Sequence, residues 1–231
     1  DAVIHTAAIT NVDYCETNPE ICQKVNVTAT AYLLNAAQKV DASFSLLSTD
    51  FVFDGEKGNY IESDIPNPLS VYAQSKVDAE SILINSANKN WSIVRTIIVF
   101  GEGNNLSRSN IVLWAKEALS SGEELNIIDD QFRAPTWADD LAWGCIKIAE
   151  LHKNGIYHIS GPETFSIYDL VLRVAKFCGL DTASLNKTTS ESLNQAARRP
   201  PKTGFDLSKA RSEIDYRPMS FEDSLNLLFS V

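Results

Sequence analysis

The chain has 231 residues, which suits one domain with a small additional lobe, and its 44% hydrophobic and 22% charged residues are typical of a globular protein. The formal net charge of −10 argues against nucleic acid as a partner, because phosphate binding needs clustered Lys and Arg. No apolar run approaches the ~20 residues of a membrane-spanning helix, so no membrane contact is expected.

The first hundred residues alternate between predicted strands and predicted helices. The apolar run at residues 2–4 is typical of a strand buried on both faces, and Phe44–Leu47 is the next strand. Between them, Asn18 and Pro19 predict a helix start, and the helix should continue to about residue 40. Its apolar face is predicted to carry Val25, Ala29, Leu33 and Ala36 or Ala37.

The rest of the chain continues this alternation. Further helices are predicted at about 71–88, 111–120, from 136 onward, 166–178 and 220–229, and further strands at 92–99, 125–129 and 155–160. Long loops occupy 54–70 and 101–109, and such loops are usually functional or disordered. The tail from 187 to 218 is polar and less regular. Strands that alternate with helices predict an α/β fold with a doubly wound parallel sheet.

The cysteines and histidines do not predict a metal site. The four cysteines contain no C-x-x-C pair, so neither a zinc site nor a disulfide framework is expected. They are expected to be thiols of a reducing compartment, which predicts a cytoplasmic protein. The cysteines are Cys15, Cys22, Cys145 and Cys178, and the histidines, for which structural roles are expected, are His5, His152 and His158.

Three residues within Leu46–Lys76 could act as one catalytic unit. Thr49 ends a predicted strand, and Tyr72 and Lys76 follow four residues apart on one face of a predicted helix. A free tyrosine has a pKa of about 10, and a neighbouring ammonium would bring it toward neutrality. A Y-x-x-x-K pair alone is common on helix surfaces. Here all three residues should lie outside the carboxyl ends of parallel strands, where ligands bind.

Several segments resemble, in order, successive motifs of the extended short-chain dehydrogenase/reductase family, and most closely its dTDP-4-dehydrorhamnose reductase branch. STDFVFDG is the more diagnostic motif, because Y-x-x-x-K is shared by the whole superfamily. The segments are DAVIHTAAITNVDYCE, LLSTDFVFDG, NPLSVYAQSK, RTIIVFGEG, DDQFRAPTWADDLA and the R-R-P tail from Arg198. The resemblance implies one domain over 1–231, with its Rossmann part mainly in 1–100 and a small C-terminal substrate lobe drawn from 101–231.

The resemblance also implies a reaction. NADP or NAD would deliver hydride to the 4-keto group of a nucleotide sugar while Tyr72 donates a proton to the carbonyl oxygen. Thr49 would orient that oxygen. Lys76 would lower the pKa of Tyr72 and hold the nicotinamide ribose.

The remaining site residues implied by the resemblance lie on the cofactor side and on the substrate side. The expected cofactor-binding residues are Ala8, Ile9, Thr10, Tyr72 and Lys76, and the expected substrate-binding residues are Thr49, Asp50, Ile98 and Arg133. Arg133 matches the arginine that contacts the nucleotide pyrophosphate in related epimerases. The reductase branch typically has Trp at the position of Ile98 and commonly Gly at that of Arg133, so the identity of the sugar stays open.

The family's phosphate-binding turn, G-x-x-G-x-x-G, does not occur in this sequence. The first residues match the family's fourth strand, and at ~30 residues per βαβ unit roughly 60 residues would precede Asp1. We therefore expect an N-terminally incomplete domain. It should expose the edge of its first strand and by itself bind dinucleotide poorly.

Two alternative functions stay open at this point. A nucleotide-sugar epimerase or dehydratase on the same scaffold would regenerate its cofactor in each turnover. A non-catalytic regulatory subunit, like the reductase-like subunit of methionine adenosyltransferase, would need no catalytic residues, whereas Thr49, Tyr72 and Lys76 are all present. Relatives are often dimers, so a homodimer is a further possibility.

Overall fold

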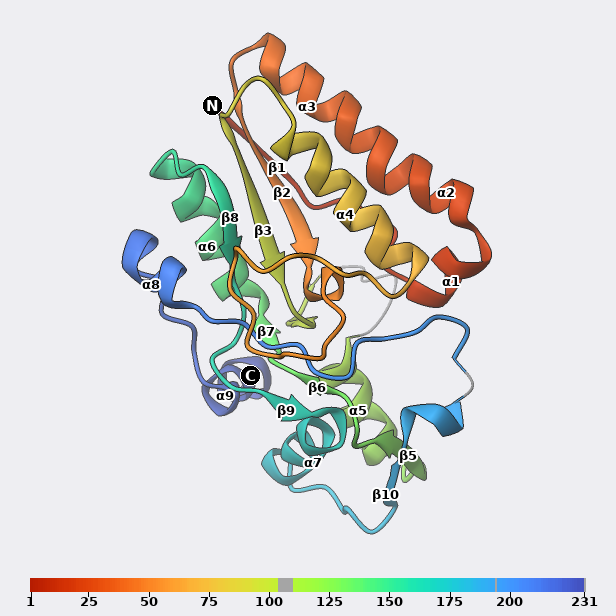
Figure 1. Ribbon diagram of the computed structural model, residues 1–231. Helices are drawn as coiled ribbons and strands as arrows, with labels where there is room; N and C mark the ends of the chain where they lie inside the picture. The colour runs from red at the N-terminus through yellow and green to blue at the C-terminus, as the bar shows by residue number, and fades with distance from the viewer. Residues whose placement is uncertain (104–109, 194, 231) are drawn as a thin grey trace.

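A parallel four-stranded sheet forms the centre of the computed structural model, which describes residues 1–103, 110–193 and 195–230 (Figure 1). The strands are β1 (Ala2–His5), β2 (Ser43–Thr49), β3 (Trp91–Thr96) and β8 (Gly155–His158), in the order β1-β2-β3-β8. Apolar residues of β2 and β3 are buried, as expected for strands covered on both faces. The predicted parallel sheet is confirmed.

Helices cover both faces of this sheet (Figure 1). One face is covered by α3 (Ala29–Lys39) and α4 (Val71–Ile84), and the other by α6 (Ala138–Glu150) and α8 (Ser208–Ile214). The short helices α1 (Val12–Thr17) and α2 (Pro19–Gln23) pack against α4. The doubly wound α/β class is therefore confirmed. Neither α1 nor α8 was predicted from the sequence.

The predicted apolar face of the helix at 25–40 is confirmed at Ala37, which is buried, while Val25 and Ala29 are half-buried. Leu33 and Ala36 are exposed, whereas the buried positions include Cys22, Asn26, Thr30, Leu34 and Ala37. A π-helical turn, η1 (Lys24–Thr28), lies between α2 and α3 and widens the spacing of buried residues to four. Two of these buried residues, Asn26 and Thr30, are polar, so a hydropathy pattern does not identify the buried face of the helix.

Strand β1 differs from the prediction in its burial. It is the edge strand of the sheet, paired with β2 alone, and Ile4 is 38% exposed. The prediction that residues 2–4 are buried on both faces is therefore wrong for this chain. The expectation that the edge of the first strand is exposed is confirmed.

A second group of elements lies beyond the carboxyl ends of the strands (Figure 1). Its helices are α5 (Ile111–Ser120), α7 (Ile167–Phe177), α9 (Phe221–Phe229) and the 3-10 turn η3 (Ser190–Leu193). Its strand pairs are β5 (Leu125–Ile128) with β10 (Leu185–Thr188), β4 (Val99–Phe100) with β7 (Thr136–Trp137), and β6 (Phe132–Arg133) with β9 (Phe165–Ser166). These elements share a hydrophobic core that includes Phe100, Trp137 and Leu225. Of the predicted loop at 101–109, residues 104–109 lie outside the described residues.

The cysteines are free thiols, and three of the four are buried. Within residues 1–103, 110–193 and 195–230, no group of His, Cys, Asp or Glu is arranged to hold a metal ion. In that same part of the chain, no helix is both long enough and apolar enough to cross a membrane.

Buried His158 makes the fold sensitive to acid. Its Nδ1 lies 3.0 Å from the Tyr60 carbonyl oxygen, its ring stacks on Phe205, and burial lowers its pKa to about 3. Between pH 6.5 and 3 the unfolded chain binds a proton that the native ring does not. Stability should therefore fall as pH falls, by roughly 3 kcal/mol at about pH 4. Urea denaturation at about pH 6.5 and about pH 4 should show a smaller loss for His158→Gln than for wild type. An equal loss in both proteins would contradict a neutral, buried His158.

Candidate active site

A pocket of about 300 Å³ lies at the carboxyl ends of β1, β2 and β3. It brings together seven of the residues predicted from the sequence, namely Ala8, Thr10, Thr49, Asp50, Tyr72, Lys76 and Ile98. It also includes five that were not predicted, namely Thr6, Leu47, Ser48, Thr96 and Val99. Because β2 and β3 are parallel and Thr49 is paired with Thr96, both strands end at this pocket.

Thr49 and Tyr72 line the same pocket because the end of β2 and the start of α4 face each other. The Thr49 Oγ1 accepts a hydrogen bond from the Phe51 N–H at 3.2 Å, which begins the short 3-10 turn η2 (Asp50–Val52). Helix α4 begins after Ser70, whose hydroxyl accepts from the Ala73 N–H, so Tyr72 lies in its first turn. Burial raises the pKa of Tyr72, while hydrogen bonding to Thr49 opposes the rise. The phenol is therefore protonated at neutral pH.

The buried ammonium of Lys76 lies one helical turn beyond Tyr72. Its Nζ donates to the Leu47 carbonyl oxygen at 2.7 Å, next to the end of β2. Burial lowers the pKa of Lys76 to about 8, and the Glu80 carboxylate opposes this change. The pKa of Tyr72 is raised overall, and not lowered as predicted, because burial of the phenol outweighs the other influences.

The turn after β1 is held by a residue that the sequence analysis missed. Asn26 Oδ1 accepts from the Ile9 N–H at 2.8 Å, and Asn26 Nδ2 donates to the Ile9 carbonyl oxygen at 3.1 Å and to Ser75 Oγ at 3.0 Å. This fixes the backbone between Ala8 and Thr10. The Ile9 side chain itself packs against Cys15, Cys22 and Tyr72 and does not line the pocket. In the sequence, the one sign of this role was that Asn26 is a polar residue within the predicted helix.

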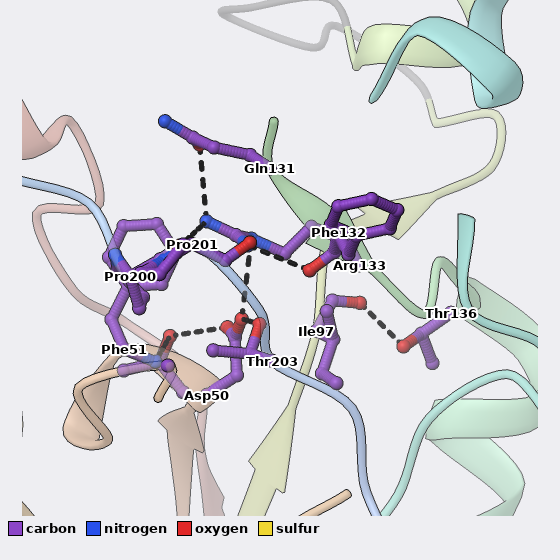
Figure 2. Close-up of polar contacts among 12 residues, drawn as sticks. Asp50, Phe51, Ile97, Gln131, Phe132, Arg133, Thr136, Pro200, Pro201 and Thr203 are labelled. Atoms are coloured by element: carbon purple, nitrogen blue, oxygen red, sulfur yellow. Dashed lines mark hydrogen bonds and ion pairs between the residues drawn. The ribbon is translucent and has the colours of Figure 1, made fainter. Parts of the chain in front are cut away.

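The structure does not bring Arg133 to the pocket. Figure 2 shows its guanidinium among Asp50, Gln131 and the segment Pro200–Thr203. Arg133 is 1% exposed and donates to the carbonyl oxygens of Phe132 at 2.7 Å and of Pro200 at 2.6 Å. It also donates to Gln131 Oε1 at 3.2 Å, and its Nε lies 3.7 Å from Asp50 Oδ2. These contacts satisfy the guanidinium inside the protein.

Asp50 lies between the pocket and this arginine. Its Oδ1 accepts from the Thr49 hydroxyl at 3.1 Å, and its Oδ2 accepts from the Thr203 hydroxyl (Figure 2). Burial raises the pKa of Asp50, and the nearby Arg133 opposes this rise. The Asp50 side chain therefore connects Thr49 to the C-terminal tail.

Ile98 has a strained backbone on the pocket wall. Its φ is 25°, a left-handed value that costs a β-branched residue on the order of 1–3 kcal/mol. Thr136 holds this conformation, because its N–H donates to the Ile98 carbonyl oxygen at 3.0 Å and its hydroxyl donates to the Ile97 carbonyl oxygen at 2.5 Å (Figure 2). A strained residue kept at a pocket is a feature of functional sites.

A parallel sheet with Thr49, Tyr72 and Lys76 at its carboxyl ends defines an oxidoreductase of the extended short-chain dehydrogenase/reductase class. Residues 1–230 match the family described as RmlD substrate binding domain, and the chain belongs to this family.

Similar proteins agree with this assignment. The dTDP-4-dehydrorhamnose reductase of Aggregatibacter actinomycetemcomitans is 33% identical over 97% of this chain and 79% of that protein. The methionine adenosyltransferase 2 subunit beta of Xenopus laevis is 32% identical over 90% of this chain and 63% of that protein. Among solved structures, the dTDP-4-dehydrorhamnose reductase of Bacillus anthracis in complex with NADP has a TM-score of 0.91 at 27% identity. The match covers 99% of this chain and 80% of that one.

Proposed function

We propose that this protein reduces the 4-keto group of a nucleotide sugar with NADPH or NADH as the hydride donor. The observation that carries the proposal is the convergence of Thr49, Tyr72 and Lys76 on one pocket. Support comes from the related dTDP-4-dehydrorhamnose reductases, one of which was solved with NADP.

The residues of the pocket fit the nicotinamide end of such a cofactor. The buried ammonium of Lys76 has three N–H donors, and one of them binds the Leu47 carbonyl oxygen. The others can donate to ribose hydroxyls. Thr6, Ala8 and Thr10 line the side next to β1. When bound, the cofactor supplies the hydride.

The chain's own residues handle the proton. Tyr72 keeps its proton at neutral pH because burial raises its pKa, so it can donate to the carbonyl oxygen as negative charge develops there. Thr49 donates to Asp50 in this structure, and it orients the carbonyl oxygen when its hydroxyl rotates to donate to the substrate instead. Lys76 favours the phenolate that forms after proton transfer, because opposite charges attract strongly in a buried site.

On the substrate side, we propose that Asp50 and Ile98 contact the sugar, since both line the pocket beside Thr49. Arg133 supports the wall behind Asp50 through the ion pair and does not contact the nucleotide in this proposal. Ile9 acts through its backbone, which Asn26 holds.

The test is NADPH oxidation by the full-length protein with a dTDP-4-keto sugar. The proposal expects one NADPH consumed for each keto group reduced. An epimerase or dehydratase would convert its sugar with no net consumption of NADPH, and that result would contradict the proposal.

A second candidate is a regulatory subunit, and the similarity to methionine adenosyltransferase 2 subunit beta supports it. In that case the full-length protein would not turn over any keto sugar and would change the activity of a methionine adenosyltransferase on mixing. The complete set of Thr49, Tyr72 and Lys76 favours the reductase.

We further propose that the protein works in the cytoplasm and as a homodimer. Four free cysteines support a reducing compartment. Exposed apolar side chains on α3, among them Tyr32 and Leu33, offer a surface for self-association. Analytical ultracentrifugation of the full-length protein measures the oligomeric state directly, and a monomer at all concentrations would contradict the dimer.

A further inference from the structure

The catalytic helix carries a third buried functional group that the proposed mechanism does not use. Tyr72, Lys76 and Glu80 follow one another at intervals of four residues, so they share one face of α4. All three are buried, and Glu80 is 1% exposed. A carboxylate is rarely buried without a partner.

Glu80 binds two different strands of the sheet. Its Oε1 accepts from the Arg95 Nε at 3.0 Å, and its Oε2 accepts from the Arg95 Nη2 at 2.6 Å, which makes a bidentate pair with β3. Its Oε1 also accepts from the Ser48 hydroxyl of β2 at 2.6 Å. Ser48 stands between Leu47, whose carbonyl holds Lys76, and Thr49. Glu80 therefore fixes the helix against the strand segment that carries the rest of the site.

A buried ion pair is weak evidence for a role in stability. Buried ion pairs can often be replaced by apolar residues of similar volume without loss of stability. Arg95 is also imperfectly satisfied, because its Nη1 has no hydrogen-bond partner within the described part of the chain. The position of the pair beside the catalytic helix points to a role in the site.

The charges around Lys76 show what that role is. The groups that interact with its ammonium are Glu80 on α4, Cys22 on α2 and His5 on β1. Burial and the nearby Lys76 lower the pKa of His5, so this ring is neutral. Of Glu80 and Cys22, the Glu80 carboxylate favours the charged form of Lys76 more strongly, against the cost of burying the ammonium.

We propose that Glu80 and Arg95 are positioning residues, which fix α4 against the ends of β2 and β3 and keep the Lys76 ammonium charged. This inference rests on the proposed function, because it assigns Lys76 a catalytic role. Neither residue lines the pocket, so they act through Lys76 and Thr49.

The test uses the full-length protein with Glu80→Gln and Arg95→Gln combined, since two amides can still hydrogen-bond and neither member of the ion pair is left charged without the other. We expect kcat to fall about 10-fold, with KM for the keto sugar changed less than about 2-fold. The alkaline limb of the pH profile should move down by about one pH unit, because Lys76 loses its neighbouring anion. Unchanged kcat and an unchanged alkaline limb would overturn the proposal, as would a rise in KM alone.

A second variant and a control separate geometry from charge. Ser48→Ala removes the contact with β2 but keeps all charges, so kcat should fall about 3-fold with no movement of the alkaline limb. Wild-type kcat in Ser48→Ala would overturn the positioning role. Lys147→Gln and Glu150→Gln combined remove an exposed ion pair, leave the net charge unchanged as the double variant does, and should behave as wild type.

A titration without turnover distinguishes this proposal from the proposed function. The ¹³Cε signal of Lys76 in lysine-labelled protein, identified by its absence in Lys76→Arg, should titrate near 8 in wild type. In the double variant the midpoint should be lower by about one pH unit. Equal midpoints would overturn the role of Glu80. If wild type titrates as expected but oxidises no NADPH, the proposed function fails and the effect of Glu80 on Lys76 stands.

Discussion

Replacing Tyr72 with phenylalanine is expected to lower kcat by about 10²- to 10⁴-fold, because it removes the proton donor from the pocket. The ring would stay in place, since it packs edge-on against Phe51 and beside the cluster of Cys15 and Cys22. KM for the keto sugar should therefore change little. Steady-state NADPH oxidation by the full-length protein measures both constants, and circular dichroism confirms that the variant is folded.

Tyr32→Phe is a matched control for this experiment, because it deletes the same hydroxyl from an exposed tyrosine on α3. It should keep wild-type kcat. If Tyr72→Phe also turned over like wild type, another group would supply the proton, and the assignment of Tyr72 would be wrong.

Replacing Arg133 with methionine is expected to lower the free energy of unfolding by about 3–5 kcal/mol, as when one partner of a buried ion pair is removed. Asp50 would keep its buried charge without the nearby cation, and the carbonyl of Pro200 would lose its donor. Urea denaturation followed by tryptophan fluorescence measures the change. Arg198→Met, at an exposed arginine of the same tail, should change stability by less than about 0.5 kcal/mol.

The same variant separates two roles for Arg133. If Arg133→Met kept wild-type stability but raised KM for the nucleotide sugar, the arginine would contact the substrate as the family resemblance implied. A stability loss with a small change in KM supports the buried, structural role.

Local sequence was sufficient for most of the fold. The helix predicted at 111–120 is found at Ile111–Ser120, and the strand predicted at 155–160 begins at Gly155. Thr49, Tyr72 and Lys76 could be placed together because parallel strands end at one edge of a sheet, and that rule needs only the order of the elements.

Interactions between distant segments could not be predicted in this way. Arg133 is buried because the Pro200 carbonyl, 67 residues away, accepts from it, and no local pattern reports that contact. Asn26 and Thr30 are buried because hydrogen bonds satisfy them, those of Asn26 to the turn after β1 and to Ser75, and those of Thr30 to His5 and to the Asn26 carbonyl oxygen. A hydropathy pattern predicts that such polar residues are exposed to solvent. Strand β10 was missed for the same reason, since LNKT has only one apolar residue and is stabilised by pairing with β5.

The hydrogen bond between Thr203 and Asp50 also has a consequence for biosynthesis. Its two residues are 153 positions apart, and at 5–20 residues per second a ribosome needs roughly 8–30 s to make the intervening chain. During that time β2 and β3 of the nascent protein can pair, but Asp50 still lacks its hydrogen bond from Thr203. We expect the catalytic end of the sheet to be the last part to become ordered, and chaperones to encounter it while it is still open.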